Sequence, residues 1–418
     1  MSPRHNGDTN GVVGHVRFIS LEYDGNNSDA SALQLVTELR AEWKEPGSKV
    51  EFVRFTEGIT NTLLKAINRR EGLSKEEIDN DAVLLRAYGN GTQILIDRQR
   101  ETENHELLMQ YGLAPELLAR FKNGMMYRYI SGKATLPEDL RKPSIYLAVA
   151  RRLAEWHATV PCLSTTTVTT NGANGAHGAS HITIEVVDSG KPPPNVWTVM
   201  QKWLLALPTA TQTQRERQAK LQGELVRLVK DLSQRPGLGK DGLVFAHCDL
   251  LSGNVIVMPR ASAVKSNDTE ETVNFIDYEY ATPSPAAFDL ANHFAEWGGF
   301  DCDFSVLPTR AQRLEFIKDY IHTYFQLLPD TEKPGVLDEE AEVTKLFDEV
   351  DEFRGVPGFY WGIWALIQAE ISQIDFDYAD YAEVRLGEYW AWRDEVTGSR
   401  ASEGRELPLR ERRWAQAE

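Results

Sequence analysis

The spacing of apolar residues changes near Lys133, and this change limits the folds open to the chain. Before it, apolar residues come in short runs such as VEFVRF (residues 50–55) and MMYRYI (residues 125–130), which predict β-strands. Helices are predicted only at residues 30–43 and 92–112 of this part. After Lys133 the apolar residues recur with helical spacing. We therefore predict an α+β fold with a small sheet-rich N-terminal lobe and a mainly helical C-terminal lobe.

A chain of 418 residues exceeds what one compact core usually holds, so two lobes are expected. We predict a disordered tail at residues 1–14, an N-terminal lobe at 15–132 and a C-terminal lobe at 133–418. Residues 163–190 and 260–272 are polar, have no helical periodicity, and predict surface insertions.

Charge and cysteine content exclude several classes of protein. A formal net charge of -17 argues against nucleic acid or an anionic membrane as the main partner. The three cysteines, Cys162, Cys248 and Cys302, lie far apart and match no disulfide framework or zinc motif. The polar N-terminus lacks the apolar core of a signal peptide, and no apolar stretch is long enough to span a membrane. These features predict a cytoplasmic protein without stable membrane insertion.

The segment LVFAHCDLLSGNVIV (residues 243–257) consists of two apolar strands around a polar loop, and the loop contains Asp249 and Asn254. Asp277 follows at the end of another apolar run, at the distance expected for a returning hairpin strand. Phosphoryl transfer needs one carboxylate for the attacking hydroxyl and further oxygen ligands for Mg²⁺. Asp249 suits the first role, and Asn254 and Asp277 suit the second.

A structural role for these residues is the alternative. An isolated Asp in a loop commonly serves as a turn or cap residue, and the spacing H-x-D-x-x-x-x-N can arise by chance. Here the match lies between two strands and has a second strand-end Asp at hairpin distance. This context favours the catalytic interpretation.

The stretches HCDLLSGN, IDYEY and FDLANHFAEW resemble the choline/ethanolamine kinase family, which is related to the aminoglycoside phosphotransferases and, more distantly, to protein kinases. The resemblance covers about residues 50–392, apart from the two insertions. It implies a two-lobed protein-kinase-like fold, an ATP-binding N-terminal lobe and a catalytic, substrate-binding C-terminal lobe. ATP and Mg²⁺ are the implied cofactors, with Asn254 and Asp277 as metal ligands. The resemblance also implies a homodimer, since family members are often dimers.

The resemblance also assigns residues to the nucleotide. RFTEGITNTL (residues 54–63) matches the phosphate loop, with donors near Thr60 and Asn61. Arg86 stands where protein kinases carry a strand lysine, and its guanidinium can bind phosphate oxygens in a bidentate manner. Glu101 matches the residue that pairs with this basic residue in the family, and Glu103 is the alternative. Pairing of Arg86 with a surface carboxylate is the structural alternative.

A cationic substrate needs carboxylates or aromatic faces around its charge. Trp361 and Trp364 lie one helical turn apart, which by itself usually indicates core packing. The family carries W-G-[LI]-W here as walls of the amine pocket, followed by a tyrosine that Tyr381 matches. Tyr280 and Glu296 fall where the family lines the pocket near the cation.

Two further residues are expected to act on the loop that carries Asp249. Asp289 matches a residue that braces the catalytic loop in related folds, and His247 is expected to support the same loop. Glu279 belongs to the same I-D-[YF]-E-Y motif as Asp277, and a structural role for it stays open.

Ethanolamine and choline are the two substrates that the resemblance implies. The segment GGFDCDFSVLPTR (residues 298–310) is similar to the ethanolamine kinase branch, so we expect phosphorylation of ethanolamine, the first step of the CDP-ethanolamine route to phosphatidylethanolamine. Choline kinase or dual activity is the alternative. A non-catalytic binding module is disfavoured because Asp249, Asn254 and Asp277 are all present, and the W-G-x-W helix argues against other small alcohols.

Overall fold

The computed structural model describes residues 16–55, 61–89, 91–162, 195–259, 271–372 and 374–418, and the short strand pairs at 167–168 and 184–185. The predicted tail and most of both predicted insertions lie outside these ranges. The chain divides into two compact units: the first comprises Met1–Asn90 and Pro115–Ser131, and the second Gly91–Ala114 and Gly132–Glu418. The helix predicted at 92–112 therefore belongs to the second unit. Within the described ranges, no helix combines the length and apolar content needed to cross a bilayer.

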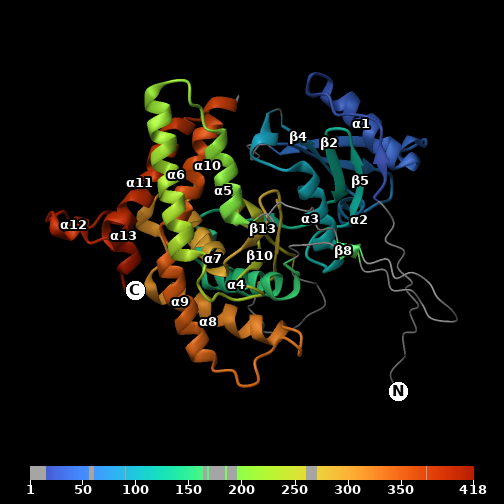
Figure 1. Cartoon of the computed structure of the whole chain (residues 1–418). Coiled ribbons are helices and arrows are strands. Elements are labelled where there is room, and N and C mark those ends of the chain that lie inside the picture. The colour runs from blue at the N-terminus through green and yellow to red at the C-terminus, as the bar shows by residue number, and fades with distance from the viewer. Residues whose placement is uncertain are drawn as a thin grey trace, which may run out of the picture. The chain divides into compact units, whose positions relative to one another are not determined.

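The first unit contains a six-stranded sheet in the order β1-β5-β6-β4-β3-β2 (Figure 1). Only the β1–β5 pair is parallel. The strands are β1 (Phe18–Ile19), β2 (Lys49–Phe55), β3 (Asn61–Arg69), β4 (Val83–Tyr88), β5 (Leu117–Phe121) and β6 (Gly124–Arg128). A Cβ at Gly124 would lie 2.2 Å from the carbonyl oxygen of Arg86, so glycine lets β6 approach β4 closely.

Helices α1 (Ser28–Leu39) and α2 (Lys75–Asn80) belong to the same unit. Ser74 and Glu77 form a capping box that begins α2. The apolar faces of α1 and the sheet share a core that includes Leu35, Val36 and Leu85. The predicted helix at 30–43 ends earlier, at Leu39, and a separate 3₁₀ turn covers residues 41–44.

The second unit is mainly helical. Its helices are α3 (Arg98–Gln110), α4 (Pro143–Thr159), α5 (Val196–Ala206), α6 (Gln212–Leu232), α7 (Ala286–Ala295), α8 (Arg310–Leu327), α9 (Glu339–Phe353), α10 (Val356–Ile371), α11 (Tyr378–Val396), α12 (Ser399–Ser402) and α13 (Leu409–Ala415). Short strands pair as β10 (Val244–Ala246) with β13 (Thr282–Ser284), and as β12 (Val273–Phe275), β11 (Val255–Val257) and β7 (Lys133–Ala134). The isolated pair β8 (Thr167–Val168) and β9 (Ile184–Glu185) falls within the predicted insertion.

Helix α3 begins later than the apolar spacing predicts. Ile94 ends a 3₁₀ turn and Ile96 precedes the helix, so neither continues the face of Leu108. The side chain of Asp97 accepts a hydrogen bond from the backbone N–H of Arg100 and caps α3 at its first turn.

Helices α10 and α11 pack side by side because α10 presents glycines to its neighbour (Figure 1). A Cβ at Gly358 would lie 2.5 Å from the carbonyl oxygen of Arg385, and one at Gly362 would lie 2.6 Å from Leu386. This close approach brings the backbone of α11 at Arg385 and Leu386 against α10.

Gly358→Ala is expected to destabilise the protein by about 1–3 kcal/mol, because the added methyl group must push α11 away from α10. Gly387→Ala is the matched control, since no atom lies within 4 Å of a Cβ there. In an open helix position, Gly→Ala should stabilise by about 0.5–1 kcal/mol. Denaturant unfolding of both variants measures the difference, and equal effects would contradict the packing argument.

Glu349 of α9 is expected to make stability depend on pH near neutrality. Burial raises its pKa to about 7, although Lys345 and Arg235 oppose the shift. Because the pKa of Glu349 is higher in the folded than in the unfolded protein, protonation of this carboxyl favours the folded state. Its contribution to the free energy of unfolding is fully present below about pH 4.5 and is lost as pH rises through about 7. Glu349→Gln should therefore be more stable than wild type by about 3 kcal/mol at pH 8 and little changed at pH 4.5.

Thermal unfolding across this pH range measures the effect. Glu352→Gln serves as the control, because that side chain is 46% exposed in its pair with Arg235. A pH dependence that Glu349→Gln leaves intact would show that another group is responsible.

Candidate active site

The loop between β10 and β11 carries Asp249 and is fixed by a buried carboxylate. Asp289 of α7 is fully buried and accepts hydrogen bonds from the backbone N–H groups of His247 (2.9 Å) and Cys248 (2.8 Å). These bonds hold Cys248 in a left-handed conformation with φ +63°. The backbone turn of Cys248 precedes Asp249 directly, so Asp289 determines the direction in which the Asp249 side chain leaves the loop.

Asp289 keeps its charge because His157 of α4 contacts it. The His157 Nε2 atom lies 3.0 Å from Asp289 Oδ2, and its Nδ1 atom lies 2.7 Å from the Tyr320 hydroxyl. Burial alone would raise the pKa of Asp289, but the hydrogen bonds and charges of its partners lower it below the usual range. The carboxylate therefore links the loop to α4 and, through Tyr320, to α8.

His247 connects the loop of Asp249 with the strand that leads to Asp277. Its Nε2 atom lies 3.1 Å from the carbonyl oxygen of Ile276, which can only accept a hydrogen bond. Its Nδ1 atom accepts a bond from the backbone N–H of Asp249 at 3.3 Å. Burial lowers the pKa of His247 to about 4, so the ring is neutral with its proton on Nε2. This arrangement suits a supporting role.

The structure brings Asp249, Asn254 and Asp277 together. Strands β11 and β12 form an antiparallel pair, and the backbone N–H of Ile276 donates to the carbonyl oxygen of Asn254 at 3.0 Å. Asp277 follows with φ +66°. The Asn254 Nδ2 atom donates to the backbone oxygen of Asp249 at 2.7 Å and to its Oδ2 atom at 3.3 Å. The Asn254 Oδ1 atom therefore points away from Asp249.

Several acidic side chains create a negative field around Asp249. Burial raises the pKa of Asp249 well above its usual range, and the charges of Asp277, Glu296 and Glu279 raise it further. Such a concentration of carboxylates favours bound cations. Among the described residues, no three His, Cys, Asp or Glu side chains form a complete metal cage. Mg²⁺ usually takes only one or two protein carboxylates beside phosphate oxygens and water, so Asn254 and Asp277 fit this ion.

Three aromatic residues predicted to bind substrate contact one another. Trp361 and Trp364 of α10 have ring centroids 5.5 Å apart at 86°, and Tyr280 lies 5.7 Å from Trp361. The Trp364 Nε1 atom donates to the Tyr280 hydroxyl, and Trp361 Nε1 donates to Asn292 Oδ1, both at 2.8 Å. The Asn292 Nδ2 atom in turn donates to the backbone oxygen of Cys248 at 3.0 Å. Asn292 thus couples Trp361 to the loop that carries Asp249.

The remaining predicted substrate residues, Glu296 and Tyr381, meet at Arg385. The Arg385 Nη1 atom lies 3.1 Å from Glu296 Oε1 and 3.4 Å from the Tyr381 hydroxyl. Burial raises the pKa of Glu296, although the charge of Arg385 opposes this shift. The Tyr381 ring also contacts Phe300 and Phe376, with centroids 6.2 and 5.6 Å away. Carboxylate and aromatic surface therefore lie together here, as a cationic ligand requires.

The predicted nucleotide residues are divided between the two units. In the first unit, Asn61 begins β3 and Arg86 lies on β4, where it faces Leu63 in register. Thr60 lies outside the described residues. In the second unit, Glu101 of α3 pairs with Arg98 at 2.9 Å, and the same Arg98 atom lies 3.1 Å from Glu279 Oε2. The predicted pairing of Arg86 with Glu101 stays a prediction.

Comparison with known proteins identifies the family in which this arrangement of residues occurs. The family model described as choline/ethanolamine kinase matches residues 52–390. The chain belongs to the choline/ethanolamine kinase family. It is 37% identical over 324 residues to "Ethanolamine kinase" of Drosophila melanogaster, a match that covers 76% of this chain and 55% of that protein. It is 33% identical over 382 residues to "Ethanolamine kinase 1" of Homo sapiens, covering 89% of this chain and 73% of the relative.

The chain thus spans about half the length of the Drosophila member of the family. A solved structure of an ethanolamine kinase from Plasmodium vivax superposes with a TM-score of 0.62 at 22% identity, covering 86% of this chain and 87% of that one. Together with the observed sheet-rich and helical units, this likeness confirms the predicted protein-kinase-like fold. Membership in the kinase family also implies the use of ATP.

Sequence reasoning missed several residues that position the family's motifs. Asn292 lies one turn beyond Asp289 on α7, and Arg385 lies one turn beyond Tyr381 on α11. Helical spacing places each on the same face as a predicted site residue, which is a signal that could have found them. Arg98 and His157 had no such signal, because their partners Glu279 and Asp289 are far away in the sequence.

Proposed function

We propose that this chain transfers the γ-phosphate of ATP to the hydroxyl group of ethanolamine. The observation that carries the proposal is the joint placement of Asp249, Asn254 and Asp277 by one loop and one hairpin. Two relatives of the chain, from Drosophila melanogaster and Homo sapiens, are named as ethanolamine kinases. A non-catalytic module would have no need to retain these three residues together.

In the proposed reaction, the ethanolamine oxygen forms a bond to the γ-phosphorus while the bond from that phosphorus to the ADP oxygen breaks. Asp249 accepts a hydrogen bond from the attacking hydroxyl and takes its proton late, as a loose transition state requires. Asn254 and Asp277 would hold Mg²⁺, which when bound neutralises charge on the phosphate oxygens. The products are ADP and phosphoethanolamine, and no covalent intermediate with the protein is needed.

The roles of the residues on the nucleotide side of the site are proposed from the chemistry of their side chains. Arg86 would bind phosphate oxygens with its guanidinium, and the donors near Thr60 and Asn61 would cover the phosphates. Glu101 would orient Arg86. These roles make the N-terminal lobe the ATP-binding lobe and the C-terminal lobe the catalytic one.

On the amine side, the ammonium group would lie against Trp361, Trp364, Tyr280 and Tyr381, with Glu296 as its counter-charge. A primary ammonium has three N–H donors, whereas a trimethylammonium has none and depends on aromatic faces. A buried carboxylate therefore supports ethanolamine, while the tryptophan pair would serve either amine. Choline, alone or beside ethanolamine, is the second candidate because of the aromatic cluster.

The cellular location and the oligomeric state of the protein are also proposed. We place the reaction in the cytoplasm, supported by three distant cysteines that form no disulfide framework. The homodimer implied by the family resemblance is tested by the particle mass in solution, and a monomeric mass at assay concentration would refute it.

The substrate is tested by ADP release from Mg·ATP with ethanolamine or choline over a range of concentrations. We expect kcat/KM for ethanolamine to exceed that for choline by about tenfold or more. A higher value for choline would move the protein to the sister activity. If neither ethanolamine nor choline leads to release of ADP, the proposed function is refuted.

A further inference from the structure

A row of buried charges leads from Glu296 to the C-terminal helix α13, and it extends the proposed function on which this inference rests. The sequence of contacts alternates in sign through Glu296, Arg385, Glu388, Arg410, Glu411 and Arg354. Arg385, Glu388, Arg410 and Glu411 are each at most 4% exposed. Helix α13 lies beyond residue 390, where the family match ends.

Arg385 is shared between two carboxylates on its opposite sides. Its Nη1 atom bonds Glu296, and its Nε atom lies 3.0 Å from Glu388 Oε1 as an ion pair without hydrogen-bond geometry. Arg385 therefore neutralises Glu296 only in part, because Glu388 competes for the same guanidinium. The second oxygen of Glu296 receives no hydrogen bond from Arg385.

Arg410 controls the position of Glu388 from the other side. Its Nε atom donates to Glu388 Oε2 at 3.2 Å, and its Nη1 atom donates to Glu411 Oε1 at 2.8 Å. Its Nη2 atom also donates to the carbonyl oxygen of Arg354. Arg354 Nε closes the row by donating to Glu411 Oε2 at 2.9 Å. Because each of its three guanidinium nitrogens donates to a fixed partner, Arg410 keeps Glu388 turned toward Arg385.

We propose that Glu388 and Arg410 are positioning residues that keep the Glu296 carboxylate available to a primary ammonium group of the substrate. Removing the charge of Glu388 frees Arg385 to bind both oxygens of Glu296, since guanidinium and carboxylate pair best in a bidentate manner. A primary ammonium then loses its acceptor. A trimethylammonium loses less, because it donates no hydrogen bond.

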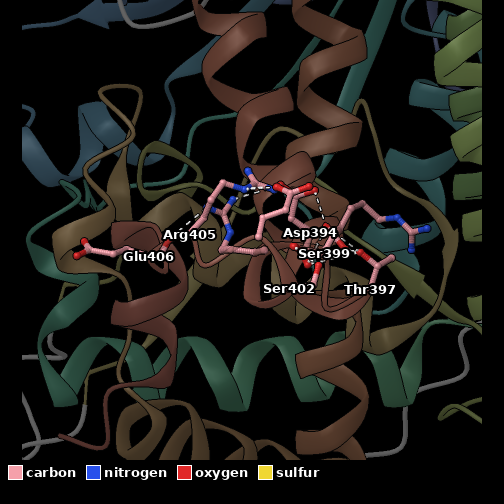
Figure 2. A network of polar contacts seen from close by, with 9 residues as sticks. Asp394, Thr397, Ser399, Ser402, Arg405 and Glu406 are labelled. Carbon is pink, nitrogen blue, oxygen red and sulfur yellow. Dashed lines mark hydrogen bonds and ion pairs between the residues drawn. The ribbon is translucent and has the colours of Figure 1, made fainter.

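The test compares Glu388→Gln, which keeps the side-chain shape, with Arg410→Gln and Arg410→Lys. Arg405→Gln is the matched control from the same C-terminal segment. Figure 2 shows that Arg405 and Ser399 bond Asp394, and among the described residues no hydrogen bond or ion pair connects this network to Glu296. KM for each amine, KM for ATP, kcat and the melting temperature are measured for all four variants and wild type.

For Glu388→Gln and Arg410→Gln we expect KM for ethanolamine to rise about tenfold and KM for choline about twofold, because one charged hydrogen bond is lost from the primary ammonium alone. KM for ATP and kcat should change by less than about threefold, and Arg410→Lys, which keeps the positive charge but lacks the planar guanidinium, should restore the ethanolamine affinity in part. Arg405→Gln should behave as wild type.

Equal rises for ethanolamine and ATP, in proportion to the loss of melting temperature, would overturn the proposal in favour of a merely structural role. An unchanged KM for ethanolamine in Glu388→Gln would overturn it as well. If Arg410→Gln fails to fold, Glu388→Gln and Arg410→Lys decide the outcome. If the wild-type protein is inactive with every amine, the proposed function is refuted instead. The positioning role is then decided on the same variants by titrating ethanolamine and following tryptophan fluorescence.

Discussion

Asp249→Asn is expected to lower kcat with ethanolamine by about 10²–10⁴-fold, the usual contribution of a positioned general base. The amide has nearly the same shape, and it can accept a hydrogen bond from the hydroxyl, but it cannot take the proton. KM for both substrates should stay within about threefold, because Asp249 acts on the transition state rather than on binding. Steady-state ADP release measures both constants.

Asp330→Asn is the control for this variant, since Asp330 is a 95% exposed carboxylate paired with Lys333. It should leave kcat unchanged. Turnover of Asp249→Asn near the wild-type rate, in folded protein, would remove Asp249 from the proposed mechanism.

Asp289→Asn is expected to destabilise the protein by about 3–5 kcal/mol, the cost of breaking a buried charged pair. Both carboxylate oxygens accept bonds, from the backbone N–H groups of Cys248 and His247, so an amide must turn its NH₂ toward a donor. The lost bonds also release the strained turn at Cys248, and kcat should fall with stability.

Denaturant unfolding measures the loss. The control is Asp319→Asn, which removes a carboxylate that is 26% exposed and pairs with Arg151 at 2.8 Å. It should cost less than about 1 kcal/mol. A cost for Asp289→Asn as small as that of its control would show that the loop does not depend on this carboxylate.

Local patterns predicted much of the fold. Apolar spacing predicted the strand over VEFVRF and the helix after Lys133, and the structure has β2 at Lys49–Phe55 and α4 at Pro143–Thr159. The same patterns missed β3, which follows a turn-like stretch, and the short β5, because few residues alternate there. Membership of α3 in the second unit depends on long-range contacts that periodicity does not contain.

For the candidate site as well, local sequence patterns predicted one part and missed another. A loop between two strands and a following hairpin predicted that Asp249, Asn254 and Asp277 meet, and the contacts of Asn254 bring them together as expected. The partners that orient them come from distant helices. His157 contacts Asp289 across 132 positions of sequence, and Arg98 contacts Glu279 across 181. Such pairs follow from tertiary packing, which a single sequence does not specify by motif.

The most direct test of the proposed function is the identity of the product. Purified protein is incubated with Mg·ATP and ethanolamine, and phosphorus NMR follows the reaction beside an Asp249→Asn sample. We expect the γ-phosphate signal of ATP to disappear while signals of ADP and of a phosphomonoester coupled to a CH₂ group appear, and we expect the variant sample to stay unchanged. Inorganic phosphate in place of the monoester, or the same monoester at equal rate from the variant, would contradict it.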